Sequence, residues 1–254
     1  MGLFTNNNIQ NISIGSNVSW YGNTMENAFF NCINFNSQIT IPYGIVSMVN
    51  TFRNCKKFNQ PVTIPNSVTS IVNTFTGCST FNHPVTIPNS VTSMASTFAT
   101  CSNFNQPVTI PNSVKSLFST FTGCTNFNQV VNIPNSITSL YSTFSNSGIK
   151  QLTIPKGATD LALTCMQCNN LTDLFILEDN VKNMYSMLSS RNNTKRLNVY
   201  VNNKSNTRFM LLNCNLTHNI ENRAFGSNNV SWSTSGAWLF NAMFNVYLYY
   251  RNYI

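Results

Sequence analysis

Hydrophobic and polar positions along the chain follow a pattern that repeats every 23 residues. Four near-identical copies follow one another directly, at residues 51–73, 74–96, 97–119 and 120–142. A looser copy occupies residues 28–50, residues 143–163 form a copy shortened by two residues, and residues 164–186 restore the full length. A fixed period of this size is typical of solenoids, in which each short unit buries its apolar positions only by stacking on its neighbours.

Each unit contains a segment with the pattern of a short strand. In the unit that begins at Thr51, Val62 and Ile64 flank Thr63, so apolar side chains alternate with a polar one. That period of two predicts a strand with one buried face and one outward face. Pro65 is expected to end the strand, because proline has no N–H to donate to a ladder.

The segment after the strand has helical spacing. Val68, Ile71 and Phe75 lie three and four residues apart, which places them on one face of a short helical turn. Cys78 and Phe81 then bring the chain back toward the core. Each unit is therefore predicted to run from strand through turn and helical turn to loop, and the stacked strands are expected to form a parallel sheet.

The composition narrows the possible functions. Hydrophobic residues make up 42% of the chain and charged residues 8%, against about 25% charged residues in ordinary soluble domains. The formal net charge is +8, but no acidic residue lies between Asn27 and Thr159, and the basic residues are scattered rather than gathered in a stripe. Nucleic-acid binding is therefore not expected. The sequence has no run of about 20 apolar residues, so membrane insertion is not expected either.

Cysteine recurs at one position of the repeat. The ladder comprises Cys32, Cys55, Cys78, Cys101 and Cys124, with Cys168 two units later. A packing position and parallel side chains suit buried, reduced thiols better than disulfides. Cys165 with Cys168, and Cys214 with His218, are zinc-ligand residue types, but the first pair falls on the repeat's own Phe and Cys positions. The sequence therefore predicts no metal site and no cofactor.

Asparagine and threonine form further ladders. The asparagines, which are expected to satisfy backbone groups at the bends, are Asn36, Asn59, Asn82, Asn105 and Asn128. The outward strand position is mostly threonine, and glutamine, once replaced by histidine, recurs just upstream of the strand. The candidate ligand-binding residues on this face are Gln60, Thr63, His83, Thr86, Gln106 and Thr109. A flat, uncharged, polar face suits carbohydrate, and the alternative is a sheet surface that only contacts solvent.

The C-terminal segment differs from the repeats in being rich in aromatic residues. The candidate docking residues there are Trp232, Trp238, Phe240, Tyr247, Tyr249 and Tyr250. Residues 246–250 alternate in the pattern of a strand. Two interpretations stay open: a cap that closes the hydrophobic end of the stack, or a docking surface for another subunit, since aromatic residues are enriched at interfaces.

Catalysis is not predicted. The chain has six carboxylates and two histidines, and none of the carboxylates lies in the regular repeats. Catalytic sites need titratable groups that are held together in a pocket. The sequence also has no metalloprotease motif, no nucleophile elbow and no glycine-rich phosphate loop.

The segment VTIPNSVTS is followed in unit after unit by TF, two residues and Cys. This order resembles the BspA-like class of leucine-rich repeats, which has the same period, an IPxSV segment and an AFxxC-type segment. The resemblance covers residues 28–186, and FNQP at 58–61 and 104–107 resembles a related repeat of bacterial surface proteins. Threonine mostly stands here where the family has alanine before phenylalanine.

The resemblance implies an α/β solenoid. The expected fold is a leucine-rich-repeat-type rod with a parallel sheet of short strands and short helical turns, capped at both ends. Residues 1–27 would form the N-terminal cap, residues 28–202 the repeat solenoid, and residues 203–254 a C-terminal aromatic cap or docking segment. Family members are typically surface adhesins, and similar repeats occur in structural proteins of viruses and bacteriophages.

Two functions stay open, and both are non-enzymatic. The preferred interpretation is a bacteriophage virion component (a fibre, decoration or tail protein) that contacts host surface glycan. It rests on an N-terminus without the pattern of a secretory signal, on reduced thiols and on the aromatic C-terminus. The alternative is a bacterial or protist surface adhesin. The expected partners are other virion proteins or a host surface receptor, with a homo-oligomer left open, and the expected location is the virion or, in the alternative, the cell surface.

Overall fold

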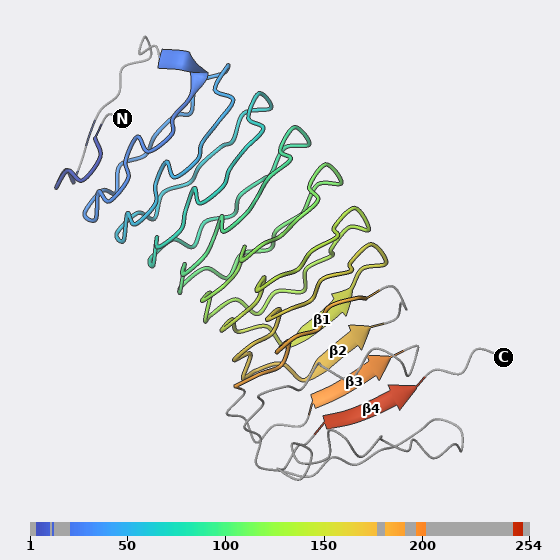
Figure 1. Ribbon diagram of the computed structural model, residues 1–254. Coiled ribbons are helices and arrows are strands. Elements are labelled where there is room, and N and C mark those ends of the chain that lie inside the picture. The colour runs from blue at the N-terminus through green and yellow to red at the C-terminus, as the bar shows by residue number, and fades with distance from the viewer. Residues whose placement is uncertain are drawn as a thin grey trace.

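The repeat units lie side by side, each resting on the one before it (Figure 1). The computed structural model describes residues 4–10, 12, 21–176, 181–190, 197–201 and 246–250. A 3₁₀ helix, η1 (Tyr21–Asn23), precedes the first unit. Four strands follow at the other end of the stack: β1 (Gln151–Ile154), β2 (Asp173–Ile176), β3 (Leu197–Val201) and β4 (Val246–Tyr250).

The four strands form one parallel sheet in the order β1-β2-β3-β4. Leu152 is opposite Leu174, and Leu174 is opposite Val199, so equivalent positions of successive units are in register. The strand predicted at residues 246–250 is confirmed, and residues 197–201 form the strand beside it. The parallel sheet predicted from the repeat is therefore present, but only from β1 onward within the described residues.

The regular units present the predicted faces without forming hydrogen-bonded strands. Val62 and Ile64 are buried, with exposed fractions of 5% and 6%, and Thr63 between them is exposed. No strand is present in residues 21–142, where pairing between units is limited to isolated bridges such as Ser70 with Ser93. The predicted side-chain alternation is confirmed, whereas the predicted strand pairing is wrong for these units.

Proline contributes to this difference in three of the regular units. In β2, the N–H of Asp173 donates to the carbonyl of Lys150 (3.2 Å), so the residue before the buried leucine faces the preceding unit. The equivalent residue in three regular units is a proline: Pro61, Pro84 and Pro107. Because proline has no N–H, this bond to the preceding unit cannot form there.

The predicted helical turns are wrong, because the segment folds as a chain of overlapping β-turns. The N–H of Thr51 donates to the carbonyl of Met48 (3.1 Å), and the third residue of that turn, Asn50, has a φ of 55°. Positive φ at this position is the geometry of a type II turn. No α-helix occurs in the described residues, so the α component of the expected α/β class is absent from them.

The amides that the turns leave unused link one unit to the next. The N–H of Asn50 donates to the carbonyl of Val72 (3.0 Å), and the N–H of Phe52 donates to the carbonyl of Thr74 (2.9 Å). This pattern repeats from the first unit to the unit that ends near residue 190. Alternate amides therefore close turns and join units, which satisfies the backbone without a helix.

Phenylalanine rings form a continuous stack inside the units. Phe75 packs against Phe81 of its own unit, with ring centroids 4.5 Å apart. It also lies 5.8 Å from Phe52 of the preceding unit and 5.7 Å from Phe98 of the next. These rings are fully buried, so the stack supplies the largest side chains of the shared core.

Buried threonine hydroxyls and cysteine thiols donate hydrogen bonds to backbone carbonyls. The hydroxyl of Thr51 donates to the carbonyls of Met25 (3.0 Å) and Met48 (2.8 Å). The thiol of Cys55 donates to the carbonyl of Phe29 (3.0 Å), and the same bond recurs along the ladder. Threonine therefore satisfies carbonyls that alanine would leave without this partner. The cysteines of the ladder are buried, as predicted.

The shortened unit, residues 143–163, fits because glycine replaces larger residues at two of its bends. A Cβ atom at Gly157 would overlap the carbonyl oxygen of Asn135, and one at Gly148 would overlap that of Thr125. The N–H of Gly148 donates to the carbonyl of Cys124 (3.1 Å). The missing two residues are thus absorbed by a close approach of backbone to backbone.

Candidate functional site

The predicted ligand-binding threonines form a straight, exposed column. Thr63, Thr86 and Thr109 occupy the same outward position in three consecutive units, and each is exposed. The column continues at Thr40, Asn132 and Thr153. The buried residues on either side fix its direction, because their side chains point into the core. The structure therefore brings these threonines together on one face, as the sequence predicted.

The glutamines of the same face are held by the asparagine ladder. The N–H of Asn59 donates to Oδ1 of Asn36 (2.8 Å), and this bond repeats in each unit through Asn128. Nε2 of Gln60 donates to the same oxygen of Asn36 (3.2 Å), and Nε2 of Gln106 donates to Oδ1 of Asn82 (3.1 Å). The predicted role of the asparagines at the bends is confirmed. The fixed glutamines leave their Oε1 atoms as acceptors for a ligand.

His83 interrupts the glutamine column. Its ring is half-buried and lies 6.4 Å from the ring of Phe81, tilted by 53°. Carboxylates are far from it in sequence, since the described units on either side contain none. His83 therefore adds an aromatic face and a ring nitrogen to the column.

Half of the predicted C-terminal docking residues lie in the part of the chain that the structure describes. Trp232, Trp238 and Phe240 lie outside the described residues. Tyr247, Tyr249 and Tyr250 lie in β4, where they are aligned with Asn198, Tyr200 and Val201 of β3. The backbone of this segment thus extends the sheet by one strand, and its docking role stays a prediction.

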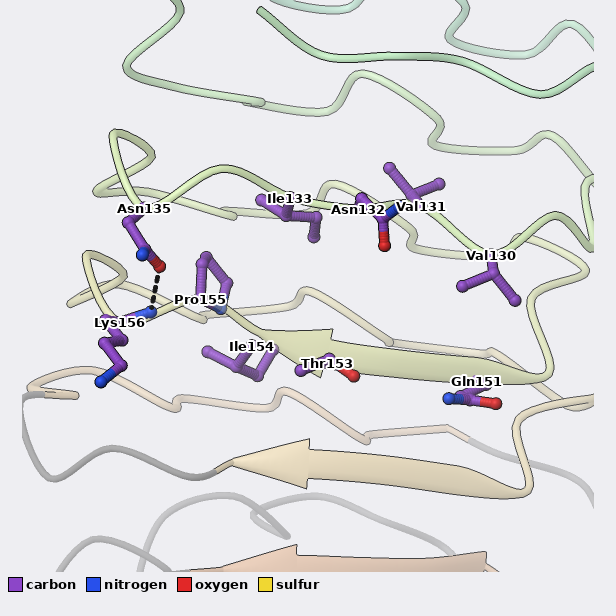
Figure 2. Close-up of a pocket in the computed structure, with 10 residues that line it drawn as sticks. All are labelled: Val130, Val131, Asn132, Ile133, Asn135, Gln151, Thr153, Ile154, Pro155 and Lys156. Atoms are coloured by element: carbon purple, nitrogen blue, oxygen red, sulfur yellow. Dashed lines mark hydrogen bonds between the residues drawn. The ribbon is translucent and has the colours of Figure 1, made fainter. Parts of the chain in front are cut away.

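A recess lies between the last regular unit and β1, and sequence reasoning did not find it (Figure 2). Its volume is about 320 Å³. The lining residues come from two segments, residues 130–135 and 151–156. One wall is apolar at its rim, where Val130 has an exposed fraction of 67%. The shortened unit marks this place in the sequence, but the gap depends on how the neighbouring units pack.

A partly exposed aromatic pair lies on the turn side of the units. The rings of Phe118 and Tyr141 stack at 5.2 Å with an interplanar angle of 5°. Phe118 has an exposed fraction of 46%, and Tyr185 occupies the same position two units after Tyr141. The signal in the sequence is an aromatic residue in SLFS and SLYS, at a position that other units fill with valine or alanine.

The described residues hold no cluster of three potential metal ligands. Cys165 and Cys168 are both buried at repeat positions, and Cys214 and His218 lie outside the described residues. Burial raises the pKa of the thiols along the ladder, and at Cys78 and Cys101 the neighbouring thiols add to the effect. Among the residues described, no helix has the length and hydropathy needed to cross a membrane.

Comparisons with known proteins address the family. The chain is similar to a leucine-rich repeat protein from Bacteroides ovatus, with 25% identity over 69% of this chain and 51% of that protein and a TM-score of 0.48. It thus spans about half the length of that protein. A leucine-rich cell surface protein from Faecalibacterium prausnitzii is 18% identical over 71% of this chain and 76% of that protein, with a TM-score of 0.30. No curated protein matches the chain.

The repeats of this chain match a known family along most of its length. The family described as the BspA-type leucine-rich repeat region matches in six copies, at residues 1–117, 48–160 and 94–217. These matches together span well over half of the sequence and include every regular unit. The chain therefore belongs to the BspA-type leucine-rich repeat family.

Proposed function

We propose that the chain is a non-enzymatic recognition protein of the surface-adhesin type, which binds its ligand through the threonine and glutamine columns. The observation that carries this proposal is the repetition of exposed, uncharged side chains at a fixed position in consecutive units. The ligand-binding residues are Gln60, Thr63, His83, Thr86, Gln106 and Thr109. Membership of a family built from interaction repeats supports binding rather than catalysis.

A glycan suits this face better than a charged ligand. No carboxylate or basic side chain occupies the columns between Thr40 and Thr109, so charge contributes little there. Hydroxyl and amide groups offer both donors and acceptors, which matches the many hydroxyls of a sugar chain. The extended segments of the regular units also keep backbone groups outside any strand ladder, and these add further donors and acceptors.

The virion interpretation loses its preference. The family match points to a class whose typical members are surface adhesins, and nothing in the fold or the family match supports a fibre or tail protein. The cell surface is accordingly the proposed location, and a host or neighbouring-cell surface receptor the proposed partner.

We keep the division of the chain as part of the proposal. Residues 28–202 would form a solenoid rod, residues 1–27 its N-terminal cap, and residues 203–254 its C-terminal cap or docking segment. The extension of the sheet by β4 supports a C-terminal segment that covers the last unit.

A triple variant tests the proposed face. Thr63→Arg, Thr86→Arg and Thr109→Arg together should leave the fold intact, because each side chain is exposed and surface changes usually cost under about 0.5 kcal/mol. Binding to an array of immobilised glycans should fall by about tenfold or more, because three guanidinium groups would block a flat face.

The matched control places the same charge elsewhere on the units. Thr69→Arg, Thr92→Arg and Thr138→Arg also change exposed threonines, at the start of the turn segments. This control should bind glycans like the unaltered protein. Equal binding by both triple variants, or no glycan binding by the unaltered protein, would remove the threonine column from consideration.

A further inference from the structure

The ring of Phe118 is covered by another ring on one face only. Phe118 stacks on Tyr141 of the next unit, with ring centroids 5.2 Å apart and an interplanar angle of 5°. Although Tyr141 covers this face, 46% of Phe118 is exposed. The exposed area therefore comes from the outer edge of the ring and from its opposite face, which points toward the preceding unit.

A notch lies beside that open face, because the same position of the preceding unit is Ala95. From unit to unit this position holds Val72, Ala95, Phe118 and Tyr141. The methyl group of Ala95 is too short to fill the space that a ring at this position would take. Ala95 is partly exposed, whereas Ala162, on the other side of Tyr141, is buried. The notch is thus open at Phe118 and not beyond Tyr141.

The notch has the thickness of one ring. Val72 lies two units from Phe118, which is about 10 Å at the usual spacing of neighbouring parallel segments. Carbon atoms make van der Waals contact at about 4 Å, so a saturated six-membered ring fills most of this distance. Such a ring laid over Ala95 would contact Phe118 with one face and Val72 with the other.

Serine hydroxyl groups surround the notch. The half-buried serines on either side of Ala95 and Phe118 are Ser93, Ser96, Ser116 and Ser119. The N–H of Phe118 donates to Oγ of Ser116 (3.2 Å), and the hydroxyl proton of Ser116 remains as a donor for a ligand. The notch therefore combines an apolar face with hydroxyl groups at its edges.

Charge is scarce around the notch. Lys115 is the only lysine, arginine or carboxylate in residues 74–142. Aromatic faces also attract cations, but a cationic ligand would find no carboxylate in these units. An anionic ligand would meet a single ammonium group. The surroundings therefore favour a neutral ligand.

We propose that the notch over Ala95 binds a neutral sugar, as a single pyranose ring that stacks on Phe118. The C–H groups on the face of a pyranose carry small positive charges, which the negative face of an aromatic ring attracts. The hydroxyl groups at the edge of the sugar suit the surrounding serines, which both donate and accept hydrogen bonds. A β-glucopyranose fits best, because its ring hydroxyls are all equatorial and both of its faces are apolar.

This site is separate from the threonine and glutamine columns. It lies on the turn segments, and it does not depend on whether those columns bind a glycan. The triple variant Thr63→Arg, Thr86→Arg and Thr109→Arg leaves every residue of the notch in place, so it should keep binding here. Failure of one site therefore leaves the other standing.

The test titrates methyl β-D-glucopyranoside into the full chain, with amide NMR as the readout. The amides of Ala95 and Phe118 should shift, with a dissociation constant in the millimolar range because a single sugar buries little surface. Phe118→Ala removes the stacking face and should weaken binding about tenfold or more. Phe118→Trp enlarges that face and should bind at least as tightly as the unaltered protein.

A second variant fills the notch and keeps its ring. In Ala95→Phe the added ring should stack on Phe118 as Phe118 stacks on Tyr141, so the sugar loses its place and binding should disappear. Ala95→Ser adds a single oxygen and should bind like the unaltered protein. Thermal unfolding of each variant checks that the units stay folded.

Three outcomes would overturn the proposal. The first is unchanged sugar binding by Ala95→Phe or Phe118→Ala, when the variant folds like the unaltered protein. The second is the absence of shifts at Ala95 and Phe118 at high millimolar sugar. The third is a shift of these amides by N-acetylphenylalaninamide without any by the sugar, which would make the notch a protein-docking site. If one variant fails to fold, the other and Phe118→Trp still decide the question.

Discussion

The regular units and the units from residue 143 onward have the same turn segments but differ in their strand segments. The ladder of turns on the shared side passes without a break through both regions, with the N–H of Phe121 bonded to the carbonyl of Thr143 (2.8 Å). On the strand side, the regular units carry extended but unpaired segments, whereas β1, β2 and β3 pair in register. The core changes at the same place, because Ile149 and Cys165 take positions that phenylalanine fills before.

The contrast indicates that the turn ladder and the phenylalanine stack, rather than a β-sheet, hold the regular units together. A parallel sheet is usually the structural backbone of a repeat of this kind, and here it forms only where proline is absent before the strand. The regular region is therefore expected to depend on its core rings, and the later region on its strands.

The largest expected effect comes from breaking the ring stack. Phe75→Ala removes a fully buried ring that contacts Phe52, Phe81 and Phe98, and it should lower the free energy of unfolding by about 3–5 kcal/mol. Cys165→Ala, at the equivalent position of the later region, removes far less volume and should cost about 1 kcal/mol. Denaturant unfolding of both variants measures the difference. Equal losses in the free energy of unfolding would contradict the claim that the regular units depend more on buried rings than the later units do.

Alkaline pH should act next, through the thiols that are concentrated in the regular units. Burial raises the pKa of Cys78, Cys101 and Cys124 above the ordinary value of 9.0, so the unfolded chain loses these protons at lower pH than the folded chain. The stabilisation is complete below about pH 8 and declines as the pH rises. These three thiols alone should remove about 3 kcal/mol from the free energy of unfolding between about pH 9 and pH 10.

Cys78→Ser is the matched control for that pH dependence. Serine is tolerated at this position of the repeat, since Ser147 occupies it in the shortened unit and lies 3.7 Å from the sulfur of Cys168. The hydroxyl does not titrate in this range, so the variant should lose about 1 kcal/mol less than the unaltered protein between about pH 9 and pH 10. A free energy of unfolding that is unchanged over this range would contradict the buried, protonated thiols.

The sequence was sufficient to predict the stacking of units, the buried positions and the outward columns, because all three follow from the period and from alternation. It was not sufficient to predict the turns. Val68, Ile71 and Phe75 have the spacing of a helix face, and all three are buried, yet the chain between them turns through positive φ at residues such as Asn73. Asparagine tolerates that conformation and gave a signal, whereas Ser96 at the same position of the next unit gave none.

The recess and the aromatic pair could not be predicted from the pattern either. The two-residue shortening was visible in the sequence, but whether it closes a gap or opens one depends on where the backbone can approach, as Gly157 and Asn135 show. The stacking of Phe118 on Tyr141 needs the register between neighbouring units, which the period gives, and an outward direction, which the mistaken helical turn obscured.

The smallest expected effect on stability is also the most direct test of why the two regions differ. In the double variant Pro84→Gln and Pro107→Gln, each glutamine restores an N–H at the position that Asp173 uses to bond to the unit before β2. If proline is what keeps these segments apart, the N–H groups of residues 84 and 107 should bond to the carbonyls of Gln60 and His83, and these amides should become protected from hydrogen exchange. The free energy of unfolding should rise by no more than about 1 kcal/mol, because each net hydrogen bond adds little and proline's restriction of the unfolded chain is lost.

The control, Gln151→Pro, places a proline at the same position of β1. The N–H of Gln151 lies on the edge that faces away from β2, so the amides of the β1–β2 pairing should stay protected. Unprotected amides in the double variant would mean that the spacing set by the phenylalanine stack, and not proline, holds the regular segments apart.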